Sequence, residues 1–244
     1  MDIKLKRSYV RAEILRKESD ARLRYYMFKR LNTGGERLSE QEIRNATIRL
    51  LDNGFNQFLI DLSKDADFRF CIDILTENQV KRKFDQELVL RFFAFKNDRE
   101  NYRHDLADFL TDYMEAVSDP AGSQDFDYTV ERSVFTKTFR VVRRAAESAD
   151  GAGAKVFGSV NAQTRAARTQ FSVYHYESIA IGLQAVLDEV NPDDSTQMDK
   201  LGAAISAGKS DPTFLALLGG GKNDQVPLRD RIQYFERAFR AALT

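Results

Sequence analysis

The sequence predicts a mainly α-helical protein, a multi-helix bundle with one or two short β-strands near the N-terminus. Apolar residues recur at three- and four-residue spacing along most of the chain, which is the helical period. The 244 residues include four prolines and no tryptophan, a composition that suits long helices better than a turn-rich sandwich. Hydrophobic residues make up 43% of the chain, enough for a sizeable core. We expect a single domain over residues 1–244, with a strand region at 1–19 and helical parts at 20–148 and 154–244.

The first expected element is a strand from Ser8 to Leu15. Within it Val10, Ala12 and Ile14 alternate with charged residues, the period-2 pattern of a half-buried strand. No comparably clear partner strand follows, and a lone strand leaves its backbone N–H and C=O groups unpaired. We therefore expect its partner to be a hairpin strand around residues 3–5, another chain, or a sheet supplied from outside this polypeptide.

A helix is expected from about Asp20 to a tight turn at Asn32-Thr33-Gly34-Gly35. Its apolar positions are Leu23, Met27 and Leu31, which recur every fourth residue. The two glycines supply the positive φ angles that end a helix and turn the chain. Ser39 and Glu42 then have the spacing of a capping box, which predicts that a second helix begins near Ser39.

Five later segments also have the apolar spacing of core helices. They are residues 84–95, 102–117, 125–148, 173–190 and 228–243. Val130, Val134 and Val141 are the expected apolar positions of the third segment, and Asn191-Pro192 is expected to end the fourth. The glycine-rich stretches at 149–153 and 219–224 are expected to be loops.

The formal net charge is zero, which argues against attraction of nucleic acid over the whole surface. The first 50 residues, however, hold 13 Lys and Arg against 7 Asp and Glu, a net charge of +6. This segment is either a solvated basic face or a patch that faces phosphates.

Cysteine content and hydropathy predict a cytoplasmic protein without a membrane partner. Cys71 is the sole cysteine, so no intramolecular disulfide is possible, and we expect it to be a small buried residue. The sequence has neither a signal peptide nor an apolar run long enough to span a bilayer.

No metal or cofactor is predicted from the remaining reactive residues. His104 and His175 are the two histidines, 71 positions apart, and Cys71 has no thiol neighbour at ligand spacing. His175 fits a hydrogen-bonded helix histidine better than a general base, because no nucleophile accompanies it. The sequence Gly219-Gly220-Gly221-Lys222 lacks the spacing and the Ser or Thr of a P-loop, which indicates a flexible linker.

The most specific motif runs from Phe28 to Ala46. It reads Phe-Lys-Arg-Leu-Asn-Thr-Gly-Gly-Glu-Arg-Leu-Ser-Glu-Gln-Glu-Ile-Arg-Asn-Ala. This stretch resembles the signature of the GmrSD-type restriction endonuclease N-terminal domain family, and residues 84–92 and 229–232 add a weaker likeness to its helical part. The positions that carry the resemblance are Arg30, Leu31, Asn32, Thr33, Gly34, Gly35, Gln41, Glu42, Arg44 and Asn45.

The resemblance implies a helical region appended to a ParB/sulfiredoxin-like nuclease or NTPase core that acts in defence against foreign or modified DNA. The Asp-Gly-Gln-Gln-Arg segment that the family carries upstream of this motif occurs nowhere in the sequence. We therefore expect a truncated or split member of such a module, non-catalytic on its own, whose catalytic part is missing or encoded separately.

Three functions follow from this resemblance. The first is binding of DNA phosphates or a partner domain through arginines near the turn, namely Arg22, Arg24, Arg30, Arg37 and Arg44. The second is a protein-interaction subunit that pairs with a separate ParB-like catalytic chain or with a second copy of itself. The third is a nucleotide or phosphodiester site that uses Asn32, Glu42 and Arg44. These residues also fit a structural role, in which Glu42 caps a helix and Arg44 pairs with an acidic neighbour.

Overall fold

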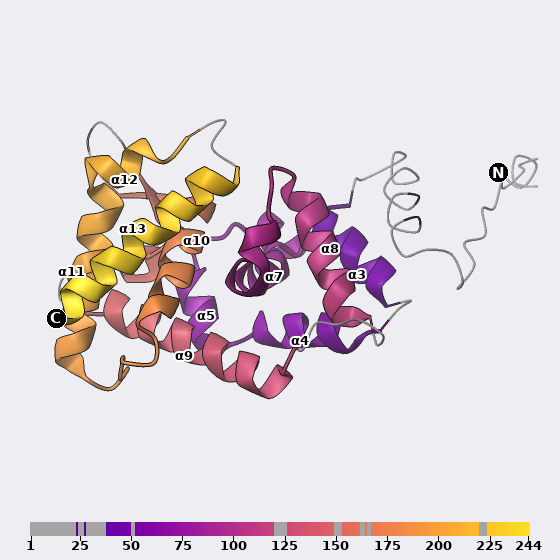
Figure 1. Ribbon diagram of the computed structural model, residues 1–244, viewed down its shortest axis with the longest axis horizontal. Helices are drawn as coiled ribbons and strands as arrows, with labels where there is room; N and C mark the ends of the chain where they lie inside the picture. Colours follow the sequence, from indigo (N-terminus) through magenta and orange to yellow (C-terminus); the bar gives the residue numbers. More distant parts are fainter. Residues whose placement is uncertain are drawn as a thin grey trace, which may run out of the picture.

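The computed structural model describes residues 38–49, 52–119, 126–148, 153–161, 167–219 and 224–244, together with Leu23, Met27 and Thr164. Helices dominate these residues, as the sequence predicted (Figure 1). The α-helices among them are α3 (Glu40–Ile48), α4 (Gly54–Leu62), α5 (Ala66–Cys71), α6 (Glu77–Lys81), α7 (Phe84–Asp98), α8 (Leu106–Ser118), α9 (Tyr128–Ala146), α10 (Val173–Gly182), α11 (Ser195–Ser210), α12 (Pro212–Ala216) and α13 (Gln225–Leu243). Short 3₁₀ helices are η1 (Arg99–Asn101), η2 (Gly153–Lys155) and η3 (Leu183–Ala185), and the strands are β1 (Gly158–Val160) and β2 (Ala167–Phe171).

Helix α7 lies in the middle of the molecule (Figure 1). The spacing of its apolar residues predicted a core helix, and this is confirmed. The buried apolar residues of α7 are Leu88, Val89, Leu90, Phe92, Phe93, Ala94 and Phe95. A helix that is apolar on nearly all sides needs neighbours on all sides, so the other helices pack around α7.

Aromatic side chains join α5, α7 and α9 into one core. The ring of Phe135 lies 5.3 Å from Phe92, 5.3 Å from Phe68 and 4.5 Å from Phe139, between ring centroids. The rings of Phe68 and Phe139 meet edge-to-face at 4.9 Å, an arrangement that the quadrupoles of aromatic rings favour. The cluster joins Phe68 of α5 to Phe135 and Phe139 of α9, and these two residues of α9 also contact Phe92 of α7.

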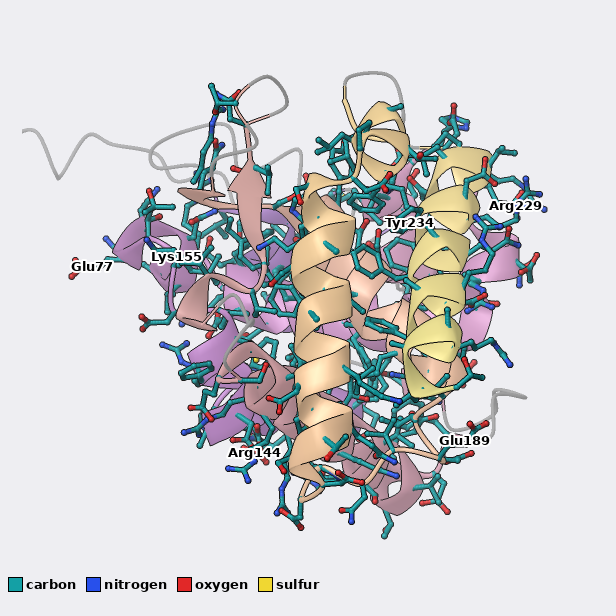
Figure 2. All side chains as sticks on the ribbon, turned by 90° about the vertical axis from the view of Figure 1, so that its left-hand side faces the viewer. Glu77, Arg144, Lys155, Glu189, Arg229 and Tyr234 are labelled. Carbon is teal, nitrogen blue, oxygen red and sulfur yellow. The ribbon has the colours of Figure 1, made fainter. Side chains whose placement is uncertain are left out.

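The other helices form two groups on either side of α7 (Figure 1). Helices α3, α4 and α8 lie on one side, and α10, α11, α12 and α13 lie on the other. In Figure 2, α11 and α13 stand side by side. One continuous cluster of buried residues, from Ile48 to Phe239, runs through both groups.

The helices predicted at 84–95, 102–117, 125–148 and 228–243 are confirmed as α7, α8, α9 and α13. In α13, Leu228, Ile232, Phe235 and Phe239 are buried as expected. One detail of α9 was wrong, because Val130 is 55% exposed. It lies in the first turn of α9, beyond the stretch that the core covers.

The helix predicted at 173–190 was too long. Helix α10 ends at Gly182, and the chain continues through the 3₁₀ turn η3. Gly182 lies so close to α13 that a Cβ there would come within 2.8 Å of the Phe235 Cβ. Leu183, Leu187 and Val190 are nevertheless buried, which explains why their spacing resembled a continuous core helix.

The described strands form an antiparallel hairpin that the sequence analysis did not predict. Residue Gly158 of β1 pairs with Phe171 of β2, and Val160 pairs with Ala167. Phe157 and Phe171 place their rings 5.1 and 6.1 Å from that of Tyr176, so aromatic packing fixes the hairpin to α10. The strands that the structure describes lie at 158–171 and not near the N-terminus, which corrects the predicted position of the strands. The strand predicted at Ser8 to Leu15 lies outside the described residues.

Gly202 of α11 allows a close approach to the end of α9. A Cβ at this position would collide with the carbonyl oxygen of Ala145 and with Ser148 Oγ. We expect Gly202→Ala to lower the free energy of unfolding by about 1–3 kcal/mol, measured by urea denaturation.

The matched control is Gly54→Ala, in the first turn of α4. A Cβ there meets the flexible carboxylate of Asp52 and no backbone. This substitution should leave stability unchanged or raise it by up to about 1 kcal/mol. Equal destabilisation by both variants would contradict the tight packing of α11 on α9.

Candidate functional site

The second half of the family-like motif begins with a capping box at the start of α3. The Ser39 backbone N–H donates to Glu42 Oε2 at 2.8 Å, and the Glu42 N–H donates to Ser39 Oγ at 3.2 Å. The capping box predicted from the sequence is therefore confirmed. The Ser39 hydroxyl also donates to the carbonyl oxygen of Arg82 at 2.6 Å, which ties the start of α3 to the turn before α7.

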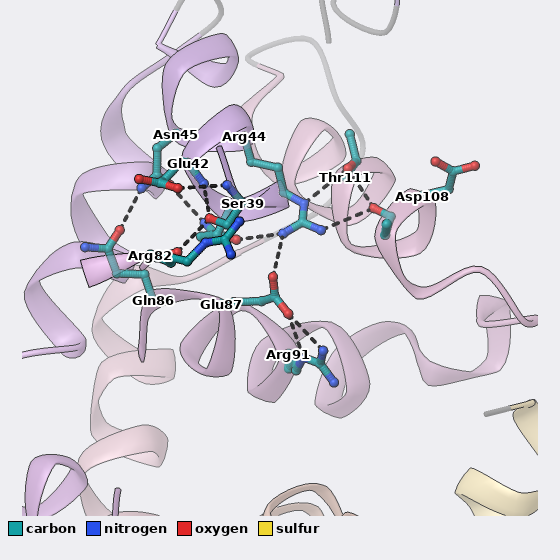
Figure 3. A network of polar contacts seen from close by, with 12 residues as sticks. Ser39, Glu42, Arg44, Asn45, Arg82, Gln86, Glu87, Arg91, Asp108 and Thr111 are labelled. Carbon is teal, nitrogen blue, oxygen red and sulfur yellow. Dashed lines mark hydrogen bonds and ion pairs between the residues drawn. The ribbon is translucent and has the colours of Figure 1, made fainter. Parts of the chain in front are cut away.

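Gln41, Arg44 and Asn45 extend this contact into a polar network between α3 and α7 (Figure 3). Arg44 Nη1 donates to Gln41 Oε1 at 2.8 Å, and Gln41 Nε2 donates to Asn45 Oδ1 at 2.9 Å. Asn45 Nδ2 then donates to Gln86 Oε1 at 2.6 Å. Each amide satisfies the next, so three motif residues act as one unit against the first turn of α7.

The Arg44 side chain is 2% exposed and lies between α7 and α8. Its Nε donates to Thr111 Oγ1 at 3.2 Å, and its Nη1 lies 3.4 Å from Glu87 Oε2. A buried guanidinium with these partners has a structural role inside the protein. In this arrangement Arg44 does not reach the surface, contrary to the expectation that it contacts an external phosphate, and the alternative of pairing with an acidic neighbour describes it correctly.

Glu87 connects Arg44 to a longer series of buried charges, which we call the ion-pair chain: Arg44, Glu87, Arg91, Glu177 and Arg231. Arg91 Nη2 lies 2.8 Å from Glu87 Oε1, and Arg91 Nη1 lies 2.8 Å from Glu177 Oε1. Arg231 Nη2 lies 3.8 Å from Glu177 Oε2. The chain thus crosses α3, α7, α10 and α13 and joins the motif helix to the last helix of the protein.

Two members of the ion-pair chain, Glu87 and Arg91, are held in their charged forms. Burial raises the pKa of the Glu87 carboxyl, but the guanidinium groups of Arg91 and Arg44 outweigh this effect and lower it below its usual value. Burial likewise disfavours the charged form of Arg91, yet Glu87 and Glu177 raise its pKa above the usual range. Arg91 is therefore a permanent cation shared by two carboxylates.

The ion-pair chain ends in a cavity of about 180 Å³ between α7, α8, α10 and α13. Arg91, Glu177 and Arg231 supply its charged wall, and Tyr102 and Tyr174 supply aromatic surface. The Arg231 guanidinium lies 4.5 Å from the centroid of the Tyr174 ring, a cation–π contact. Burial, followed by the negative charge of Glu177, raises the pKa of Tyr102 to about 12, so its hydroxyl remains protonated near neutral pH.

The structure brings together the motif residues Gln41, Glu42, Arg44 and Asn45. The other predicted site residues lie outside the described part of the chain, namely Arg22, Arg24, Arg30, Leu31, Asn32, Thr33, Gly34, Gly35 and Arg37. Sequence reasoning missed Arg91, Glu177 and Arg231. Glu177 could have been found, because it is a lone carboxylate in the apolar run Tyr176–Ile181, where a charge requires a buried partner.

The other reactive residues considered from the sequence are structural or lie apart from the ion-pair chain. Cys71 is fully buried, as predicted, and burial raises the pKa of its thiol well above the usual value. His104 is exposed and lines the cavity. Within the described residues, no cluster of His, Cys, Asp or Glu could hold a metal ion, and no helix is long and apolar enough to cross a membrane.

His175 is fully buried and stacks on Phe214, with ring centroids 5.5 Å apart. Neither ring nitrogen has a hydrogen bond of full geometry within the described residues, but a weak hydrogen-bond contact with the Gly158 backbone raises the pKa slightly, so the expectation of a hydrogen-bonded helix histidine is met in part. Burial, with a smaller contribution from the positive charge of Lys209, lowers its pKa to about 3. His175 is therefore a neutral core residue near neutral pH.

Replacement of Arg44 tests the buried end of the ion-pair chain. We expect Arg44→Met to lower the free energy of unfolding by about 3 kcal/mol, because Thr111 and Glu87 lose a buried donor while Glu87 keeps Arg91. Arg49→Met, at the exposed end of the same helix, should change stability by less than about 0.5 kcal/mol. Similar losses in the two variants, measured by urea denaturation, would show that Arg44 has no special structural role.

His175 should make stability depend on pH. Its folded pKa lies below the unfolded value of about 6.5, so the unfolded chain binds the proton first and stability falls as the pH decreases from about 6.5 towards 3. We expect His175→Phe, which keeps the ring on Phe214, to remove roughly 4 kcal/mol of this acid destabilisation. An unchanged slope of stability against pH in His175→Phe would contradict the assignment.

Comparisons of the chain with protein-family models, curated proteins and solved structures find no match. No relative therefore assigns a role to the capping box, to the ion-pair chain or to the cavity. Their function follows from the chemistry of the residues themselves.

Proposed function

We propose that this chain is a non-catalytic helical portion of a GmrSD-like DNA-defence module, and that its basic N-terminal segment binds DNA. The segment is defined as residues 1–37. It holds 11 Lys and Arg against 5 Asp and Glu, so it accounts for the whole net charge of +6 in the first 50 residues. A concentration of positive charge in one segment of a neutral protein favours binding to phosphates. This charge asymmetry carries the proposal.

The geometry of α3 supports a docking role for the second half of the motif. Glu42, Arg44 and Gln41 all direct their polar atoms to internal partners, in the capping box and in the network with α7 and α8. None of these groups is arranged as a nucleophile or as an acid–base pair. The motif helix thus provides a rigid attachment for whatever precedes Ser39 in the sequence.

The arginines of α9 are less suited to DNA binding than the basic N-terminal segment. Arg140 Nη2 lies 2.7 Å from Asp193 Oδ1, and Arg143 contacts both Asp67 and Glu147 at 3.0 and 3.1 Å. These carboxylates neutralise the positive charge of the arginines and so reduce their attraction for a phosphate. The described surface there is a set of ion pairs and not a basic patch.

The other candidate is a protein-interaction subunit without DNA binding, which would recruit a ParB-like catalytic chain or a second copy of itself. The hydrogen-bond network between α3 and α7 supports this candidate as much as the first, because a rigid helix could dock a protein partner as well as a nucleic acid. A third candidate, a nucleotide-dependent nuclease component, would need Glu42 or Arg44 to face a substrate, and both have internal partners.

We expect the full chain to bind a duplex DNA oligonucleotide with an affinity that falls steeply as salt rises, measured by fluorescence anisotropy. The triple variant R22A/R24A/R37A should lose about tenfold or more in affinity at low salt and should have a smaller salt slope. The control R229A/R237A/R240A removes the same charge from exposed positions of α13 and should bind as the parent chain does.

Equal losses in the two triple variants would reduce the effect to net charge and contradict a specific role of the N-terminal segment. Undetectable DNA binding, with self-association or capture of a co-expressed ParB-like chain, would favour the interaction subunit. Hydrolysis of NTP or cleavage of DNA by the purified chain with magnesium or manganese would contradict the non-catalytic assignment.

A further inference from the structure

Lys209, in the last turn of α11, is a lysine whose amine lies in the interior of the protein. The residue is 4% exposed, and its Nζ donates to the backbone carbonyl oxygen of Lys155 at 2.9 Å. Within the described residues, no carboxylate forms an ion pair with Lys209. Buried ammonium groups are ordinarily paired with a carboxylate, because an isolated charge is costly in low dielectric. In its charged form, Lys209 is therefore a buried cation without a counter-charge.

His175 is the second buried group with unused polar atoms. It is 0% exposed, and neither ring nitrogen has a hydrogen bond of full geometry within the described residues. Its ring is held in place by stacking on Phe214. Buried polar atoms that lack a partner cost free energy, so the imidazole can accept or donate one more hydrogen bond at a gain.

Lys209 and His175 meet at one short piece of backbone between η2 and β1. Lys209 contacts the carbonyl oxygen of Lys155, and His175 makes its weak contact with the backbone of Gly158. A Cβ on Gly158 would lie 3.0 Å from that same Lys155 oxygen, so the two points of contact are neighbours. The positive charge of Lys209 also lowers the pKa of His175, which places the amine and the imidazole near each other.

The environment of Lys209 makes its amine a nucleophile. Burial lowers the pKa of Lys209 to about 8, so much of the amine is neutral in slightly alkaline solution. A neutral imidazole nearby can take up a proton, and a nucleophile next to a base is the arrangement of covalent catalysis and covalent modification. Because Lys209 is almost closed to water, only a small uncharged electrophile can reach it. Carbon dioxide meets this requirement, whereas a sugar aldehyde or a ring-bearing carbonyl compound does not.

We propose that Lys209 binds carbon dioxide as a carbamate, with His175 as the acceptor of the released proton. The lone pair of the neutral Nζ forms a bond to the carbon of carbon dioxide, and one C–O π-electron pair moves onto oxygen. The nitrogen loses one proton, which passes to the imidazole of His175. The N–H that remains on Nζ still donates to the Lys155 carbonyl oxygen.

The carbamate would correct the charge and the hydrogen bonding of this region together. A buried ammonium without a counter-charge is replaced by a carbamate and an imidazolium, an ion pair of zero net charge. The carbamate oxygens also supply the acceptor that His175 lacks among the described residues. This site is independent of DNA binding by the N-terminal segment.

Chemical trapping tests the proposal on the full chain. We equilibrate the protein with bicarbonate near the pKa of Lys209, about 8, alkylate carbamates with triethyloxonium and map the peptides by mass spectrometry. The ethyl carbamate should appear on Lys209 at about tenfold or more the yield on Lys200, an exposed lysine of the same helix. The α-amino group, with an ordinary pKa of about 7.7–8.0, is the positive control for trapping. No adduct on Lys209, or an equal yield on Lys200, would overturn the proposal.

Replacement of His175 tests the proton acceptor. His175→Phe keeps a ring on Phe214 but removes the base and the partner of the carbamate, so the yield on Lys209 should fall about tenfold. His104→Phe, which replaces an exposed histidine, should give the parent yield. Circular dichroism checks that both variants are folded. A parent yield in folded His175→Phe would overturn the role of His175, and if that variant is unfolded the ratio of Lys209 to Lys200 in the parent chain decides.

Urea denaturation gives a second readout that does not depend on trapping. A ligand that binds only the folded chain stabilises it, so bicarbonate should raise the urea midpoint of the parent chain. Lys209→Met removes the amine and should not respond to bicarbonate. The same ionic strength of sodium chloride should have no such effect. An equal rise with chloride would indicate a simple bound anion, and a rise that persists in Lys209→Met would indicate another site; either result would contradict the carbamate.

Discussion

The arrangement of the helices depends on one shared cation, Arg91, between the carboxylates of Glu87 and Glu177. Each carboxylate is largely removed from water, and two buried carboxylates on neighbouring helices would repel each other without the guanidinium between them. Glu87 then holds Arg44 of α3, and Glu177 holds Arg231 of α13. Because breaking a buried pair leaves an uncompensated charge, the register of α3, α10 and α13 against α7 is fixed by Arg91 as well as by apolar packing.

The aromatic core and the ion-pair chain involve different residues of the same helix, α7. Phe92 and Phe93 of α7 contact Phe135 of α9, while Glu87 contacts Arg44 of α3 and Arg91 contacts Glu177 of α10. Apolar packing is tolerant of small shifts, whereas a hydrogen-bonded ion pair is not. The ion-pair chain therefore adds directional contacts between helices to the non-directional apolar packing of the aromatic cluster.

The sequence predicted those parts of the fold in which local pattern and tertiary environment agree. The stripe from Phe84 to Phe95 identified α7, and Ser39 with Glu42 identified the start of α3, because both signals are complete within a few residues. The end of α10 at Gly182 depends on its distance from Phe235 of α13, more than 50 positions away, and no local signal records that contact. The hairpin at 158–171 was missed for the same reason, since Phe157 and Phe171 are anchored by Tyr176 and not by strand alternation.

In the site, as in the fold, some features could be predicted from neighbouring residues and others depend on contacts far away in the sequence. The motif predicted that Gln41, Glu42, Arg44 and Asn45 belong together, but Arg44 meets Thr111 and Glu87, 67 and 43 positions away, so its role as a buried partner could not be read from the motif. Arg44 and Arg91 are paired with buried carboxylates, and the ion-pair chain continues to Arg231, which the motif does not contain. A family-like signature at one end of the ion-pair chain can therefore be structural, although the other end of the chain reaches a cavity.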